Sequence, residues 1–180
     1  MTAPLHHARR ILAPLALVAT LMCSPAPAAA SLDQGRPACD YCRMILSEPA
    51  FGGEVRLRSG AVRIYDAIEC LAAAVLTDSL PQRDIRAILV IDHDAPHAKL
   101  AVGRATLVHC TSIESPMGQG FLAVRDAARA RATCAAPSGT VLDWRGVLAR
   151  VNAAWFGGKL AVEKHATAGV VPPPKRTSRR

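Results

Sequence analysis

Hydrophobic and polar positions in the first half of the chain follow three successive patterns, and each predicts a different element. Two stretches of alternating residues flank Ser59-Gly60, a turn signal typical of a β-hairpin. An apolar run follows Asp66, which with Glu69 three residues later resembles the capping box that starts a helix. The predicted elements are hairpin strands at 54–58 and 61–65, a helix from 67 to about 78, and a buried strand at 87–91.

The second half repeats this order of patterns without repeating the residues. Its predicted elements are strands at 105–110 and 120–124, a helix from 127 to 135 capped by Asp126, a strand at 140–142 and a helix at 144–156. Residues 92–103 and 111–119 are predicted to be loops. The chain is therefore predicted to be an α+β protein of two small packed ββαβ units, at 31–92 and 93–165, with an additional C-terminal helix.

The two ends of the chain differ from this folded part. Residues 1–30 have a basic start, a short apolar run and an Ala-x-Ala cleavage site, which predicts a secretory signal peptide and a periplasmic protein. Cys23 offers a second possibility, lipid attachment, although the residues before it match a lipoprotein signal poorly; a membrane anchor is expected only in that case. Residues 166–180 hold three consecutive prolines and a basic end, which predicts a disordered tail.

Composition and charge narrow the classes of function. The net charge of +8 invites a nucleic-acid interpretation, but six of these charges lie in the first and last ten residues and leave +2 for residues 11–170. Nucleic-acid affinity depends on clustered neutralisation of phosphates, so no nucleic-acid partner is expected. The 51% hydrophobic fraction suffices for a core, which must be mainly aliphatic because only 4% of residues are aromatic.

A group of sulfur side chains carries the candidate chemistry. Cys39, Cys42 and Met44 fall within six residues, and Met117 lies in a distant loop between Pro116 and Gly118. Thiolates and thioethers are soft donors that suit Cu(I) better than Mg²⁺ or Ca²⁺. A Met in a polar loop has little reason to be there for packing, so the two methionines and Cys42 are predicted to bind metal together.

A Cys-x-x-Cys pair also has uses other than copper binding. Covalent haem attachment fails because Arg43 occupies the histidine position. A structural zinc site needs two further ligands, and the remaining cysteines are scattered. A thiol–disulfide oxidoreductase remains an alternative, although no strand precedes Cys39 to place it at a helix N-terminus. A structural disulfide between Cys39 and Cys42 is also possible in an oxidising compartment.

The other candidate residues are less specific. Signal cleavage leaves five cysteines, an odd number, so at least one is not paired within the chain. Cys70, in an Ala-rich helix, is interpreted as a core residue. Cys110 and Cys134 are either core residues or one disulfide. His93, His97 and His109 lie near the second loop in sequence and can supply a nitrogen, but each is expected to be an ordinary solvated or hydrogen-bonded histidine.

Three motifs occur together in one exported chain: Cys-x-Tyr-Cys-x-Met, Tyr-Asp-x-Ile-x-Cys-Leu and Ser-Pro-Met-Gly-x-Gly. Over residues 39–127, their order and spacing resemble the NosL family of periplasmic copper-binding accessory proteins. This resemblance implies two ββαβ units and Cu(I) held by Cys42, Met44 and Met117, with Cys39 as the least secure ligand. It implies a copper carrier that is not an enzyme, with a copper-accepting protein of the nitrous-oxide reductase assembly machinery as its partner. Arg43 stands where Gly is frequent in the family.

Overall fold

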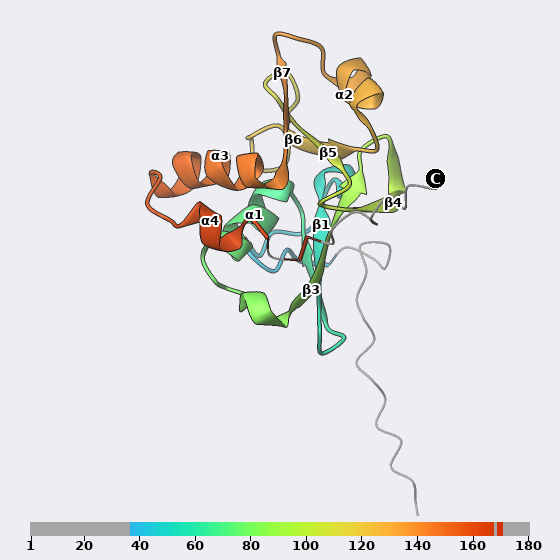
Figure 1. Cartoon of the computed structure of the whole chain (residues 1–180). Coiled ribbons are helices and arrows are strands. Elements are labelled where there is room, and N and C mark those ends of the chain that lie inside the picture. Colours follow the sequence, from blue (N-terminus) through green and yellow to red (C-terminus); the bar gives the residue numbers. More distant parts are fainter. Residues whose placement is uncertain (1–36, 168, 171–180) are drawn as a thin grey trace, which may run out of the picture.

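Two antiparallel sheets form the framework of the protein (Figure 1). The computed structural model describes residues 37–167, 169 and 170. The first sheet has the order β2-β1-β3-β4, and its strands are β1 (Gly53–Leu57), β2 (Val62–Tyr65), β3 (Ile85–Asp92) and β4 (Ala95–Ala101). The second sheet has the order β6-β5-β7, and its strands are β5 (Thr106–Cys110), β6 (Phe121–Val124) and β7 (Gly139–Leu142).

Helices connect and cover these sheets. They are α1 (Ile68–Leu76), α2 (Ala127–Thr133), α3 (Trp144–Phe156) and α4 (Val162–His165), with 3-10 turns η1 (Pro49–Phe51) and η2 (Gln82–Asp84). Helices α1, α3 and α4 gather on one side of β1–β3, whereas α2 lies beside the second sheet at the other end of the molecule (Figure 1). The strand–strand–helix–strand order occurs twice, which confirms the predicted α+β fold with an additional C-terminal helix.

The prediction of a loop at 92–103 is wrong, because this segment forms β4 and pairs with β3. The first sheet therefore extends past the predicted unit boundary at residue 92. Strand β4 contains Pro96 and Lys99 and is partly exposed along its length. These residues interrupt the alternation that predicts a strand. Both are tolerated in an edge strand, because a proline there leaves no partner strand without a hydrogen bond and a lysine discourages pairing with another chain.

The start of α1 also differs from the prediction. Its N-cap is Ala67 and its first helical residue is Ile68, and no side chain caps it. Asp66, the predicted cap, instead accepts a hydrogen bond from the thiol of Cys42. Every residue of α1 is buried, as expected of a helix that is apolar except for Glu69 and packs between the first sheet and α3.

The buried apolar residues form two clusters. The larger one lies around α1, α3 and the first sheet, and it includes Cys39 and Cys70. The smaller one lies mainly in the second unit, where it includes Val108, Leu122 and Val124, and Phe51 of the first unit joins it. The two sheets meet where the backbone N–H of His93 donates to the carbonyl of Ala123 at 2.8 Å, so the second unit is held against the end of β3.

Several predictions concern the ends of the chain. The predicted signal peptide and Cys23 lie outside the described residues. Of the predicted tail, Gly169 accepts a backbone hydrogen bond from Ile88 and Val170 packs against the larger cluster; residues 168 and 171–180 lie outside the described part. Within the described residues, no helix has the length and apolar character needed to span a membrane.

Candidate metal centre

The Cys-x-x-Cys-x-Met segment is a tight hairpin-like loop. An isolated bridge joins Ala38 to Ile45 at its base. Inside it, the N–H of Cys39 donates to the carbonyl of Met44 at 2.8 Å, and the N–H of Arg43 donates to the carbonyl of Cys39 at 3.0 Å. Arg43 has a φ of 66°, in the left-handed region that favours glycine. This geometry explains why glycine suits position 43: the turn must close within four residues.

Contacts to two elements hold this loop in place. The N–H of Asp40 donates to the carbonyl of Ile64 on β2 at 2.8 Å, and the Asp40 carboxylate accepts from the N–H of Ile64 at 2.8 Å. The loop therefore satisfies backbone groups on the outer edge of β2. On the other side, the ring of Tyr41 stacks on Trp155 of α3, with 6.3 Å between ring centroids.

Four potential ligand side chains converge under the loop. The Sγ atoms of Cys39, Cys42 and Cys70 and a carboxylate oxygen of Asp66 all lie within 4.8 Å of one another. The loop supplies two of these residues, the segment before α1 supplies Asp66, and the first turn of α1 supplies Cys70. A metal about 2.3 Å from each sulfur allows two sulfurs to be at most about 4.6 Å apart. Small side-chain movements therefore suffice to bring these atoms onto one ion.

Hydrogen bonds order the cluster before any ion is present. The thiol of Cys42 lies 3.7 and 3.6 Å from the two carboxylate oxygens of Asp66, which is 1% exposed. The Asp66 carboxylate therefore orients the sulfur of Cys42. A buried carboxylate beside thiols also brings negative charge to the site, and buried charges in proteins are usually paired or bound to metal.

The three thiols differ in acidity. A hydrogen bond from Cys70 lowers the pKa of Cys39 to about 6, and backbone groups of Asp66, Cys42 and Tyr41 add to this effect, while burial opposes it. The same contact, together with burial, raises the pKa of Cys70. Burial is the largest cause of the raised pKa of Cys42. Cys39 is thus the most acidic of the three thiols.

The two predicted methionine ligands occupy different environments. Met44 is 49% exposed beside the cysteines, although such an apolar side chain usually packs in a core. Met117 is partly buried and packs against the larger cluster, which contains Cys39 and Cys70 and is also contacted by Cys42. Met117 thus contributes to the larger cluster, and binding of metal by either methionine stays a prediction.

A buried hydrogen bond fixes the second loop to α1. The hydroxyl of Ser115 donates to Glu69 at 2.5 Å and accepts from the N–H of Gly120 at 3.0 Å. Burial raises the pKa of Glu69, whose other carboxylate oxygen has no hydrogen-bond partner among the described residues. Gly120 has a φ of 67°, and a Cβ there would lie 2.2 Å from the carbonyl oxygen of Cys110, so only glycine fits.

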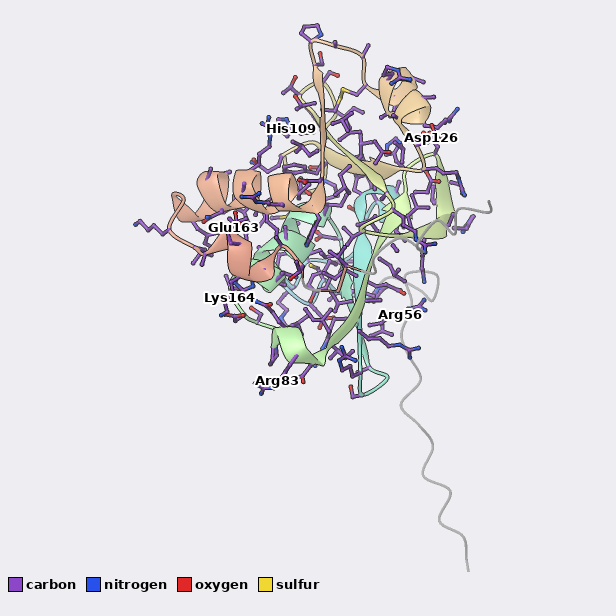
Figure 2. The ribbon with its side chains drawn as sticks, viewed as in Figure 1. Arg56, Arg83, His109, Asp126, Glu163 and Lys164 are labelled. Carbon is purple, nitrogen blue, oxygen red and sulfur yellow. A yellow bond between two sulfur atoms is a disulfide. The ribbon has the colours of Figure 1, made fainter. Side chains whose placement is uncertain are left out.

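The histidines have other surroundings. His93 packs edge-on against Phe51, and His109 packs against Phe121 on the second sheet (Figure 2). His97 is exposed on β4. Burial lowers the pKa of His109, and Arg150 adds to this effect. Within the described part of the chain, the four-residue cluster contains no histidine.

The pairing of the remaining cysteines is resolved by the structure. Cys110 at the end of β5 and Cys134 after α2 form a disulfide (Figure 2). Cys39, Cys42 and Cys70 are free thiols. The disulfide belongs to the smaller cluster, in the second unit, so the chain separates a structural sulfur pair from the thiols of the candidate site.

Sequence reasoning missed two members of the cluster. Cys70 is buried, as predicted, but its sulfur lies beside those of Cys39 and Cys42 and does not merely fill the core. Asp66 is predicted from the sequence to cap the helix, whereas in the structure it belongs to the cluster. The available signal was the Tyr-Asp-x-Ile-x-Cys-Leu motif, which places Asp66 and Cys70 only four residues apart at the start of α1.

The fold and this cluster define a small α+β protein with a thiol-rich candidate metal site. The chain belongs to the NosL family, whose model matches residues 30–151. In fold it is similar to the crystal structure of the copper chaperone NosL from Shewanella denitrificans, with a TM-score of 0.55 and 19% identity over 67% of this chain and 95% of that one. A search of curated proteins finds no match.

Proposed function

We propose that this protein is a carrier of Cu(I), not an enzyme, and that it delivers copper to a copper-accepting protein of the nitrous-oxide reductase assembly machinery. The observation that carries the proposal is the convergence of three free thiols beneath a loop whose Met44 is 49% exposed. Membership in the NosL family and the structural likeness to a copper chaperone support copper as the cargo.

The ligand types favour Cu(I) as the cargo. We propose Cys42, Met44 and Met117 as ligands, with Cys39 as a further thiolate. Soft sulfur donors match Cu(I), and thioethers bind without losing a proton. Ligands on loops near the surface also let an acceptor's sulfur replace them one at a time, which a carrier needs.

Zn²⁺ is the competing ion, because three thiolates and one carboxylate can satisfy its tetrahedral preference. Asp66 is the discriminating group. A carboxylate is a hard ligand that suits zinc better than Cu(I), whereas the methionines suit only the softer ion. Parallel titrations with Zn²⁺ and Cu(I) of an Asp66→Asn variant separate the two: loss of zinc binding alone is expected.

A thiol–disulfide oxidoreductase is the alternative function, and the lowered pKa of Cys39 favours it. Exposure argues against it. Cys39 is fully buried and Cys42 is the more accessible thiol, so a substrate disulfide cannot reach the more acidic sulfur. Turnover in an insulin-reduction assay at a rate comparable to a thioredoxin would overturn the carrier proposal.

We propose the periplasm as the location. The Cys110–Cys134 disulfide supports this, because disulfides persist mainly outside the cytosol. Release of the mature chain without a lipid is expected from cleavage before Ser31. Mass spectrometry of the processed protein distinguishes it from a form lipid-modified at Cys23.

The decisive experiment is an anaerobic Cu(I) titration against a chromogenic chelator. Wild type is expected to bind one Cu(I), and the Cys42→Ser, Met117→Ala double variant is expected to lose high-affinity binding. Val141→Ala is a matched control, since Val141 is 55% exposed on the second sheet and a change there should leave binding unaltered. Normal affinity in the double variant would remove the proposed site.

A further inference from the structure

The sulfur atoms near the loop lie at graded depths. Met44 is 49% exposed, Cys42 is half-buried, and Cys39 and Cys70 are fully buried. The two buried sulfurs come from different elements, one from the loop and one from α1, and yet they meet within 4.8 Å. A single open site at the surface would not require a third thiol at this depth.

Cys70 is the residue that the surface site leaves unexplained. It lies on α1 two residues before three consecutive alanines, where a small apolar residue would fill the space equally well. Its sulfur is instead directed at Cys39 and Cys42, in a group that also contains a carboxylate. Packing accounts for the burial of Cys70, but it does not account for the convergence of three thiols.

We infer that Cys39, Cys42 and Cys70 form an inner, all-thiolate seat for the cargo ion, and that Cys42 also belongs to the outer site with the methionines. This inference rests on the proposed function. Cys42 is the only thiol among the three that combines contact with the cluster and partial exposure, so it is the ligand that both positions share.

The two seats have different chemical properties. In the inner seat, each thiol that binds releases its proton, and charged thiolates then hold the ion away from water. In the outer seat, neutral thioethers replace Cys39 and Cys70 while Cys42 stays bound, and each thiolate that leaves the ion takes up a proton from solvent. The ion remains Cu(I) throughout, and one metal–sulfur bond breaks as another forms. Asp66 is a positioning residue, because it orients Cys42 from a buried site.

This arrangement assigns storage to the inner seat and transfer to the outer one. A partner that approaches the exposed Met44 reaches the ion only after it has moved outward. The predicted consequence is that Cys70 controls how tightly copper is held, whereas Met44 controls how fast an acceptor removes it.

The test compares Cys70→Ala with Met44→Ala by chelator competition, copper X-ray absorption and stopped-flow removal of Cu(I). Cys70→Ala is expected to lose one sulfur from the copper shell and to weaken affinity by more than about tenfold, since even residues that only support a metal ligand contribute about that much. Met44→Ala is expected to weaken Cu(I) affinity less than Cys70→Ala does and to slow removal of the ion by the acceptor. Val75→Ala is the matched control, because it truncates another fully buried residue of α1 without removing a sulfur.

The outcomes separate the two proposals. Equal copper shells and affinities in Cys70→Ala and wild type would overturn the inner seat, while a loss in the Cys42→Ser, Met117→Ala variant would keep the carrier function. Failure of the wild-type protein to retain Cu(I) would overturn both the inner seat and the carrier function. If Cys70→Ala does not fold, wild-type absorption spectra decide: three thiolate sulfurs support the inner seat, and a shell of one thiolate with thioethers overturns it.

Discussion

Ser115 in the second loop donates a hydrogen bond of 2.5 Å to Glu69 on α1, the residue next to Cys70. Both partners are buried, at 6% and 0% exposure. The contact ties the loop that carries Met117 to the helix that carries Cys70. A buried polar pair therefore joins the second unit to the helix that supplies one residue of the candidate metal centre.

Ser115→Ala is expected to lower the free energy of unfolding by about 1–3 kcal/mol, because it leaves a buried carboxylate and the N–H of Gly120 without their partner. Urea denaturation measures this change. The control Ser59→Ala, in the exposed turn between β1 and β2, should shift stability by no more than about 0.5 kcal/mol. Equal stabilities of the two variants would show that the Ser115 pair contributes nothing.

The disulfide is expected to stabilise the second unit. It closes a loop with a sequence separation of 24, for which chain entropy predicts about 3.5 kcal/mol. Replacing Cys110 and Cys134 by Ala should lower thermal stability accordingly and leave Cu(I) stoichiometry unchanged, because the candidate thiols lie in the other cluster. Loss of copper binding in a folded double variant would contradict this separation.

Stability should fall in mild acid because of His165. Its Nδ1 lies 2.7 Å from Nε2 of Gln82, and burial is the main cause of its lowered pKa. As pH falls below 6.5, the unfolded chain takes up a proton before the folded one does, so unfolding is favoured until the lower folded pKa is passed. His165→Gln is expected to flatten this part of the pH–stability curve. His97→Gln, on an exposed position of β4, should leave the slope as it is.

Arg43→Gly is expected to stabilise the protein by about 1 kcal/mol, because the left-handed backbone at this position strains any residue with a Cβ. Arg43→Ala separates conformation from charge, since it removes the guanidinium but keeps the Cβ. A gain in melting temperature for Gly and none for Ala supports the conformational cause. Equal gains would attribute the effect to the charge.

Much of the fold could be predicted because local patterns agree with tertiary packing. Trp144–Phe156 forms the predicted helix with both boundaries correct, because Asp143 caps its start and Gly157 adopts a left-handed conformation at its end. The hairpin around Gly60 and the cap at Asp126 are confirmed for similar local reasons. Strand β4 escaped prediction because edge strands tolerate residues that central strands exclude.

The candidate site was less accessible to sequence reasoning, because it depends on contacts across long separations. Asp66 lies 24 residues from Cys42, its hydrogen-bond partner, and Glu69 lies 46 residues from Ser115. A residue such as Cys70 looks like core in sequence, since burial and ligation favour the same residue type in an apolar helix. Its place in the candidate metal site becomes visible only in the structure, where the loop with Cys39 and Cys42 lies against it.

The cluster contains an odd number of free thiols, three. Oxidation of any pair within the cluster always leaves one reduced sulfur, so air exposure yields a mixture of isomers with one remaining thiol. The same chain needs an oxidant for Cys110 and Cys134. During maturation, Cys110 and Cys134 must therefore be oxidised while the three cluster thiols stay reduced. A metal ion bound in the proposed inner seat would be the simplest protection of these thiols against oxidation.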